Sequence, residues 1–409
     1  MLLHPLLKAR VTTGRLAVVY ADGRVENYGD GVGTPVALRI SRRGERHILT
    51  HGALGVGEAY MDGDLSFDTG GLMEFLALAA SNLPSEQRPR RHGPLARAWI
   101  AFLHRVRQRN DRHRAARNVH HHYDLGLDLY RRFLDRDLQY SCAYFPRGDL
   151  SLDEAQAAKK AHIAAKLRLK PGLRVLDIGC GWGGLGLELV REHGCEVLGV
   201  TLSAEQQQVA KARAEAMGLS RRARFAVTDY RELGGRFDRI VSVGMFEHVG
   251  EPNYRTFFET VSRLLTEDGV ALIHSIGRRG PPDITAPFIR KYVFPGGYIP
   301  SLSETTAAVE ESGLWITDIE ILRLHYAQTI ARWRERFENE RSALALIYDE
   351  RFCRMWEFYL AVSEMSFRSG GHMNFQLQLA KRVDALPLTR DYMLEAERAS
   401  GDNRRRARA

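Results

Sequence analysis

One short stretch of the chain constrains its fold more than any other. Residues 175–185 read V-L-D-I-G-C-G-W-G-G-L, so an apolar, β-branched run leads directly into a glycine-rich turn. The run predicts a buried parallel strand, and Leu185, Leu187 and Leu189 begin the apolar face of a helix. Glycines let the backbone bend sharply and approach a ligand closely, and a helix start presents free N–H groups to an acceptor. The stretch therefore predicts a strand, a ligand-binding loop and a helix, with Asp177 at the end of the strand.

Strand and helix patterns alternate from residue 173 onward. The predicted strands are 175–178, 196–200, 223–227, 239–243 and 270–275, and the predicted helices between them are 183–193, 203–217 and 253–265. Alternation at this spacing predicts a doubly wound, mostly parallel sheet. Ligands of such sheets bind at the carboxyl ends of the strands. The polar residues that fall at those ends are Asp177, Thr201, Asp229, Glu247 and His274.

The residues before this sheet predict a separate small α+β module. Asp22-Gly23 lies between two strand-like runs, 16–20 and 24–28, which is a hairpin signal. A third strand is expected at 36–40 and an apolar helix at 72–80. We divide the chain into an N-terminal module with a basic connecting segment (1–115), a catalytic domain (116–400) and a disordered basic tail (401–409). After a strand at 315–321, we expect aromatic-rich helices to the end.

The positive charge of the chain is unevenly distributed. The net charge is +9, and ten arginines but only one acid, Asp111, fall between Arg88 and Arg117. Such a bias favours a polyanionic partner, either a nucleic acid or an anionic membrane surface. Leu95, Trp99 and Phe102 recur at helical spacing in this segment. They fit a helix that lies on a membrane, or equally an ordinary helix packed on the core.

The cysteines and histidines do not predict a metal site. The four cysteines, at 142, 180, 195 and 353, include no C-x-x-C pair, which indicates neither zinc nor a disulfide framework. The consecutive His120–His122 side chains would diverge too far to share one ion. No run of 18 apolar residues occurs, so we expect no membrane-spanning helix, and the N-terminal apolar run, broken by His4 and Pro5, is not typical of a signal peptide.

The glycine-rich loop itself distinguishes between two cofactors. A dinucleotide-binding loop would have an acidic residue about 20 positions on, to bind the ribose. The next strand instead ends G-V-T-L-S at 199–203, which disfavours NAD. The loop resembles motif I of S-adenosylmethionine-dependent methyltransferases, D-x-G-x-G-x-G. The G-V-T-L-S-x-x-Q that follows resembles one branch of them, the cyclopropane fatty acid synthases and mycolic acid cyclopropane synthases.

Motifs along nearly the whole chain support this resemblance. They are H-Y-D-L-G at 122–126, Y-S-C-A-Y-F at 140–145, F-E-H-V-G at 246–250, H-S-I-G at 274–277, K-Y-V-F-P-G at 291–296 and L-H-Y at 324–326. The family resemblance implies a Rossmann-like class I methyltransferase sheet with helices on both faces. It also implies that residues near 291–296 form a lid over the substrate pocket, and that the N-terminal α+β domain is the one found in the longer bacterial synthases.

The resemblance also implies a site. The residues that surround a bound bicarbonate in this family correspond to Cys142, Glu247, His274, Ile276 and Tyr326. The residues that correspond to those around S-adenosylmethionine are Tyr123, Ser141, Asp177, Gly179, Cys180, Gly181, Trp182, Gly183, Thr201, Ser203, Gln206, Asp229 and Tyr230. The implied substrate is an unsaturated phospholipid in an anionic membrane, with the protein bound peripherally at its cytoplasmic face and a homodimer as one possible assembly.

The chemistry requires a dry pocket and a base. Methyl transfer from a sulfonium to a cis alkene leaves a carbocation that water would quench. A base must then remove a proton from the new methyl group so that the ring closes. No side chain is an obvious free base; His274 is one candidate, and a bicarbonate held by His274 and Tyr326 and oriented by Glu247 is another. Glu247 could alternatively serve the fold alone.

Three other functions remain open at this stage. A related lipid methyltransferase would use the same cation to give a methyl-branched chain. A nucleic-acid methyltransferase fits the positive charge, but residues 242–246 read S-V-G-M-F, without the N/D-P-P-Y/F motif of amino-type base methyltransferases. An inactive lipid-binding protein is disfavoured because all five residue types of the bicarbonate pocket are present.

Overall fold

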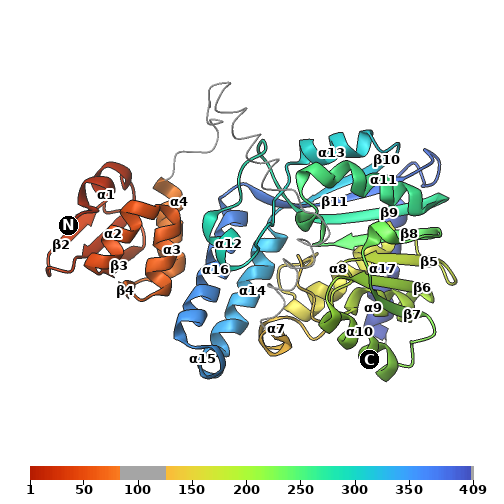
Figure 1. Ribbon diagram of the computed structural model, residues 1–409, viewed down its shortest axis with the longest axis horizontal. Coiled ribbons are helices and arrows are strands. Elements are labelled where there is room, and N and C mark those ends of the chain that lie inside the picture. Colours follow the sequence, from red (N-terminus) through yellow and green to blue (C-terminus); the bar gives the residue numbers. More distant parts are fainter. Residues whose placement is uncertain (83–125, 407–409) are drawn as a thin grey trace. The chain divides into compact units, whose positions relative to one another are not determined.

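A computed structural model describes residues 1–82 and 126–406 (Figure 1). The chain forms two compact units. The first contains Met1–Arg91, Thr285–Pro295 and Ala327–His372, and the second contains His92–Ile284, Gly296–Tyr326 and Met373–Ala409. Tyr123, His120–His122, the arginine-rich segment and the expected boundary at residue 115 lie outside the described residues, so that boundary stays a prediction.

The second unit is built on a seven-stranded sheet in the order β10-β11-β9-β8-β5-β6-β7. The strands are β5 (Arg174–Ile178), β6 (Glu196–Thr201), β7 (Ala223–Val227), β8 (Phe237–Val243), β9 (Leu265–Arg278), β10 (Trp315–Leu322) and β11 (His372–Ala380). Strands β7, β6, β5, β8 and β9 run parallel to one another. The mostly parallel sheet predicted from the sequence is therefore confirmed.

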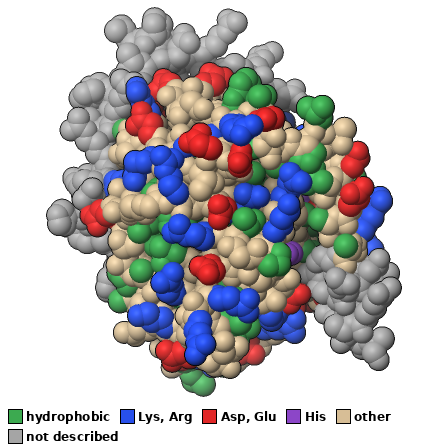
Figure 2. All heavy atoms as spheres, turned by 90° about the vertical axis from the view of Figure 1, so that its right-hand side faces the viewer, with side chains coloured by type: hydrophobic (Ala, Val, Ile, Leu, Met, Phe, Trp, Pro, Cys, Tyr) green, Lys and Arg blue, Asp and Glu red, His purple; other side chains and the backbone are tan. Residues whose placement is uncertain are grey.

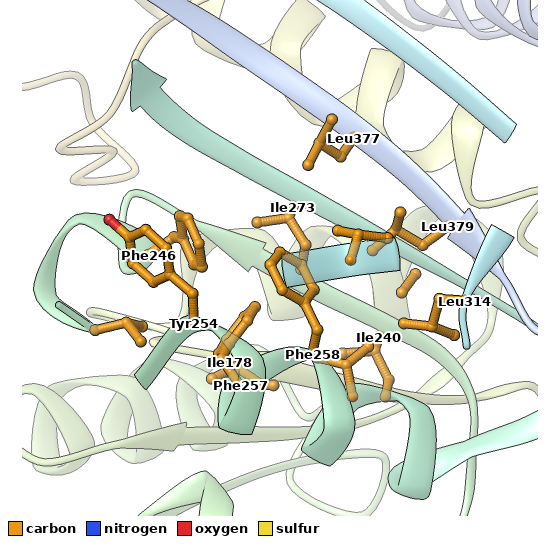
Figure 3. Packing of buried hydrophobic residues seen from close by; sticks show 14 of the residues in the cluster. Ile178, Ile240, Phe246, Tyr254, Phe257, Phe258, Ile273, Leu314, Leu377 and Leu379 are labelled. Atoms are coloured by element: carbon orange, nitrogen blue, oxygen red, sulfur yellow. The ribbon is translucent and has the colours of Figure 1, made fainter. Parts of the chain in front are cut away.

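Helices cover both faces of this sheet, because its central strands are buried on both sides. Leu176 and Ile178 belong to one apolar cluster with α11 (Tyr254–Leu264) and α13 (Leu302–Glu310). Val175, which precedes Leu176, belongs to a second cluster with α8 (Leu152–Lys166), α9 (Gly184–His193) and α10 (Ala204–Ala216). Figure 3 shows the first cluster, in which aromatic rings of α11 pack over isoleucines of the strands.

Two predictions for the C-terminal part are wrong. We expected helices throughout, but residues 372–380 form β11, antiparallel to β10. Phe375, Leu377 and Leu379 alternate along it and enter the core, so period-2 packing outweighs the helical reading. Residues 401–406, expected to be disordered, continue the helix α17 (Asp391–Arg406), because each added helical residue gains one further backbone hydrogen bond.

The first unit contains a four-stranded sheet in the order β2-β1-β3-β4. Its strands are β1 (Arg15–Val19), β2 (Val25–Tyr28), β3 (Pro35–Ile40) and β4 (Leu65–Thr69), and its N-terminal helices are α1 (His4–Arg10), α2 (Arg42–His51), α3 (Ala53–Met61) and α4 (Leu72–Asn82). The predicted hairpin is confirmed: β1 and β2 pair antiparallel, and Gly23 has the positive φ of +83° that such a tight turn favours.

Segments from late in the chain complete the first unit. They are α12 (Pro287–Tyr292), α14 (His325–Asn339, from Ala327 on), α15 (Arg341–Tyr348) and α16 (Glu350–Arg368). A Cβ on Gly57 of α3 would lie only 2.4 Å from the Phe288 ring and 2.7 Å from the Phe358 ring. Glycine at this position therefore allows α3 to approach α12 and α16 closely.

A buried carboxylate also joins α3 to α12. Glu58 accepts hydrogen bonds from the Lys291 ammonium and the Tyr292 hydroxyl, and its other oxygen contacts His47. Burial acts to raise the pKa of Glu58, but these bonds outweigh it and lower that pKa to about 2. Lys291 and Tyr292, at the start of the residues near 291–296 that were expected to form a lid, are thus held within the first unit, and the lid stays a prediction.

One face of the molecule has a surface of mixed charge. Figure 2 shows one face of the molecule, on which Lys and Arg side chains are interspersed with Asp and Glu. In the part of the chain that the structure describes, no helix is both long enough and apolar enough to cross a membrane.

Candidate active site

The loop from β5 to α9 contains three glycines in left-handed backbone conformations. Gly179, Gly181 and Gly183 have φ values of +81°, +53° and +81°. A Cβ on Gly179 would lie 2.7 Å from Met245, and one on Gly183 would lie 2.8 Å from Ala210, whereas a Cβ on Gly181 would meet nothing within 4 Å. Packing therefore requires glycine at 179 and 183, while Gly181 borders open space that a ligand could fill. Cys180 and Trp182 are buried between them.

Asp177 lies at the carboxyl end of β5 and is almost completely buried. Its Oδ2 atom has no hydrogen-bond partner among the described residues. Burial raises the pKa of Asp177 to about 7, against the opposing charge of Lys159. An unpartnered acceptor at a ligand-facing strand end is a group that a bound ligand can satisfy.

The residues after β6 form a local hydrogen-bonded network. The Thr201 hydroxyl donates to Gln206 Oε1 at 2.8 Å, and Ser203 caps α10 by accepting from the Gln206 N–H. After β7, Asp229 forms an ion pair with Arg231, and Tyr230 packs edge-on against Phe257. The structure thus places these predicted cofactor residues at the carboxyl ends of adjacent strands, with their side chains already oriented.

Helix α8 holds the segment that contains Ser141 and Cys142. Gln156 Nε2 donates to the carbonyl oxygens of Gln139 and Ser141, at 3.1 and 2.9 Å. Lys159, one turn further along α8, donates to Gln139 Oε1 at 2.7 Å and to Ser141 Oγ at 2.9 Å. Ser151 and Glu154 form a capping box at the start of α8. The roles of Gln156 and Lys159 were not predicted from the sequence.

Glu247 and Ile276 are brought together by η2 (Phe246–His248) and β9. Glu247 Oε1 accepts the Ile276 N–H at 2.6 Å, and its Oε2 is buried without a hydrogen-bond partner in the described part of the chain. Burial raises the pKa of Glu247 to about 7, although the Ile276 N–H opposes this. The carboxyl group is therefore close to half-protonated at neutral pH, with one oxygen available.

His274 is surrounded by amides of β11. Its Nε2 lies 3.0 Å from Asn374 Nδ2, and its Nδ1 lies 3.1 Å from Gln376 Nε2. Burial keeps the pKa of His274 well below its usual range, so the ring is neutral and has one N–H donor and one acceptor. Such a ring has only one acceptor nitrogen, so it cannot accept a hydrogen bond from both amide NH₂ groups. One amide must present its oxygen instead, and the oxygens of both amides lack other partners among the described residues.

The start of α14 brings Tyr326 to the segment at 140–145. The Phe145 N–H donates to His325 Nδ1 at 3.0 Å, and the Tyr144 ring stacks on His325 with centroids 5.0 Å apart. Tyr326, the next residue, is buried. The structure thus brings the Cys142 segment next to the Tyr326 segment, and the Glu247 turn next to Ile276. Tyr123 lies outside the described residues.

The sheet order, the glycine loop and the polar strand ends define a class I S-adenosylmethionine-dependent methyltransferase. The family model described as mycolic acid cyclopropane synthetase matches residues 110–377, and a domain of unknown function matches residues 2–88. The chain therefore belongs to the mycolic acid cyclopropane synthetase family.

Individual relatives agree with this assignment. The chain is 40% identical over 339 residues to the cyclopropane-fatty-acyl-phospholipid synthase of Escherichia coli K12, covering 83% of this chain and 86% of that one. It is 36% identical over 383 residues to the tuberculostearic acid methyltransferase UfaA1 of Mycobacterium tuberculosis, covering 89% and 87%. Among solved structures, the cyclopropane synthase MmaA2 of Mycobacterium tuberculosis has a TM-score of 0.62 at 33% identity, covering 65% of this chain and 98% of that one. The structure of CmaA1 complexed with SAH and CTAB has the same TM-score at 34% identity, covering 64% and 97%.

Proposed function

We propose that this enzyme transfers the methyl group of S-adenosylmethionine to the cis double bond of an unsaturated phospholipid acyl chain and closes a cyclopropane ring. The observation that carries the proposal is the 40% identity to a cyclopropane-fatty-acyl-phospholipid synthase over most of both chains. The glycine loop and the buried Glu247 supply sites that fit the two small molecules the reaction needs.

S-adenosylmethionine supplies an electrophilic methyl group when it is bound. The residues that would hold it are those at the loop and strand ends. Gly181 leaves space for the cofactor beside the loop, and the unpartnered oxygen of Asp177 would accept a hydrogen bond from it. Ser203 and Gln206 would border the cofactor on the side of α10.

Bicarbonate supplies the base in this proposal. Glu247 fits it because one carboxylate oxygen is buried and unpartnered, and because its pKa near 7 reduces repulsion of an anion. Glu247 would accept the hydroxyl of the anion and orient it, while Tyr326 donates. The one N–H of the neutral His274 ring could donate as well only if the amide of Asn374 or Gln376 that faces it turns away. Since His274 resists protonation, it is a poor general base, which favours an external one. Cys142 and Ile276 would complete the wall of this pocket.

A methyl-branched product is the second candidate, favoured by the 36% identity to the tuberculostearic acid methyltransferase. The two outcomes share one carbocation. Loss of a proton from the new methyl group closes the ring, whereas a 1,2-hydride shift followed by loss of a proton from the same methyl group gives a methylene branch, which a separate hydride donor would have to reduce to a methyl branch. We place the enzyme at the cytoplasmic face of an anionic membrane, with no nucleic acid as substrate; the arginine-rich segment 88–117 is the basis for this placement.

The test is incubation with isotope-labelled S-adenosylmethionine and vesicles of a monounsaturated phospholipid. Mass analysis of the acyl chains should show the gain of one CH₂, and proton NMR should show cyclopropyl hydrogens and no alkene. Vinyl hydrogens on the new carbon would favour the methyl-branching route. Removal of dissolved CO₂ should slow turnover and added bicarbonate should restore it; unchanged turnover would refute bicarbonate as the base.

A further inference from the structure

Helix α8 carries three buried lysines, and they differ in their partners. Lys160 forms ion pairs with Asp137 and Glu188, and Lys166 forms ion pairs with Asp318 and Glu320. Lys159 is completely buried, yet in the described part of the chain it has no ion pair. Its two hydrogen bonds go to neutral atoms, Gln139 Oε1 and Ser141 Oγ.

Lys159 is buried without an ion pair, and the charge of the buried Asp135, which does not pair with it, only partly offsets the cost of desolvation. Burial lowers the pKa of Lys159 to about 8, so the group is still mostly cationic at neutral pH. Its third N–H donor also has no acceptor among the described residues. Both facts indicate that an anion is missing from this position.

The neighbours of Lys159 identify the anion. Ser141, which accepts a hydrogen bond from Lys159, is one of the residues that we assign to the cofactor. Asp177, whose charge interacts with Lys159, has a buried oxygen without a partner. Lys159, which forms no ion pair in the described part of the chain, and Asp177, which has one oxygen without a partner there, thus each lie beside a segment assigned to the cofactor. The methionine end of S-adenosylmethionine carries the complementary pair, a carboxylate and an ammonium.

We propose that Lys159 binds the carboxylate of the methionine end of S-adenosylmethionine, while Asp177 accepts its ammonium. This rests on the proposed function only for the identity of the cofactor. Ser141 then has a second role, since its hydroxyl is held by Lys159 at the edge of the same site. Bicarbonate is the competing anion, but Glu247, the residue assigned to it, accepts a hydrogen bond from the Ile276 N–H and forms none with Lys159 among the described residues.

The test compares two ligands on three forms of the full chain by calorimetry, in buffer free of CO₂. The ligands are S-adenosylhomocysteine and its decarboxylated form, which retains the ammonium. The forms are the wild type, Lys159→Met and Gln156→Met. Gln156 also hydrogen-bonds the segment 139–141 from α8, but it has no charge. It is therefore a matched control for the positioning of that segment alone.

Lys159→Met should weaken S-adenosylhomocysteine about 10- to 100-fold, the range for a lost hydrogen bond to a charged group. Its affinity for the decarboxylated ligand should stay within about twofold of that of the wild type. Gln156→Met should affect both ligands equally. If Lys159→Met does not fold, as judged by circular dichroism, Lys159→Gln replaces it with the same expectation.

Three results would overturn the proposal. One is an equal loss for both ligands in the Lys159 variant, which would make Lys159 a purely structural residue. The second is unchanged binding of both ligands together with a raised bicarbonate requirement in turnover, which would assign Lys159 to bicarbonate. The third is a wild type that binds neither ligand. A wild type that binds S-adenosylhomocysteine through Lys159 but leaves lipid unmodified would refute the proposed function and support this inference.

Discussion

Replacement of Glu247 by glutamine should stabilise the protein and slow it at the same time. Burial raises the pKa of Glu247 from 4.5 to about 7, a shift of about 2.5 units, and each unit corresponds to 1.36 kcal/mol. Since the folded state favours the neutral carboxyl, the unfolded state ionises first as the pH rises from about 4.5 to 7, and folding stability falls through that window. Above it, ionised Glu247 costs the wild type about 3 kcal/mol.

Glutamine does not ionise, and its side-chain oxygen can still accept the Ile276 N–H. The free energy of unfolding of Glu247→Gln should therefore exceed that of the wild type by about 3 kcal/mol at pH 8 and by almost nothing at pH 4. Because a chain of two units need not unfold in one step, the measurement is amide hydrogen exchange of peptides from β9. At pH 8, protection in the variant should be on the order of 100-fold higher.

Turnover should change in the opposite direction. Loss of one electrostatic contact that acts in the transition state typically lowers kcat by about 10²–10³, while affinity for S-adenosylmethionine should change little. Glu310→Gln alters an exposed carboxyl of α13 in the same unit and serves as the control. Equal protection of variant and wild type at pH 8, or normal turnover of the variant, would refute the buried, anion-orienting role of Glu247.

Three further predictions concern other parts of the molecule. Gly181→Ala places its methyl group in open space, so it should lower cofactor affinity in calorimetry and cost about 1 kcal/mol of stability through the left-handed backbone. Gly183→Ala would clash with Ala210 and should lower the melting temperature more than Gly181→Ala does. A larger drop in melting temperature for Gly181→Ala would contradict the loop geometry. Glu58→Ala removes the acceptor of Lys291 and Tyr292, so trypsin should cut after Arg290 or Lys291 several times faster than in the wild type; equal cleavage rates would show that Glu58 does not anchor the segment. Charge reversal within residues 88–117 should weaken sedimentation with anionic vesicles by about 1 kcal/mol per residue, and wild-type binding should fall with salt; unchanged sedimentation would favour an ordinary core helix there.

The sequence predicts the parts of this fold that depend on local patterns. Local patterns indicate the strand–loop–helix at 175–193, the parallel strands around it and the capping box of α8. Strands buried on both faces show as continuous apolar runs, and a capping box shows as a serine followed three residues later by a glutamate. Strand β11 was missed although N-F-Q-L-Q-L at 374–379 alternates strictly. Its polar residues are buried as deeply as its apolar ones, and nothing local distinguishes a polar residue that will contact His274 from one that will face water.

The missed parts of the site have the same physical origin. Lys159 resembles any solvated lysine of an amphipathic helix until the neighbouring segment 139–142 covers it. The first unit also contains residues 285–295 and 327–372. They join it through contacts between residues more than 200 positions apart, which local sequence patterns do not indicate. The resemblance to a known family named Glu247, His274 and Tyr326 as candidates. It did not reveal that Asn374 and Gln376 contact His274.

The discontinuity of the first unit has a consequence for how the protein is made. The face of α3 around Gly57 packs on Phe288 and Phe358, and the ribosome adds about 5–20 residues per second. The 301 residues from Gly57 to Phe358 (358 − 57) therefore take roughly 15–60 s to synthesise. During that time the N-terminal sheet and α3 are outside the ribosome with an apolar surface that has no partner. Nascent chains of this protein should consequently depend on chaperones that shield such surfaces, and a truncated form that starts after residue 91 should leave α12 and α16 uncovered and prone to aggregate.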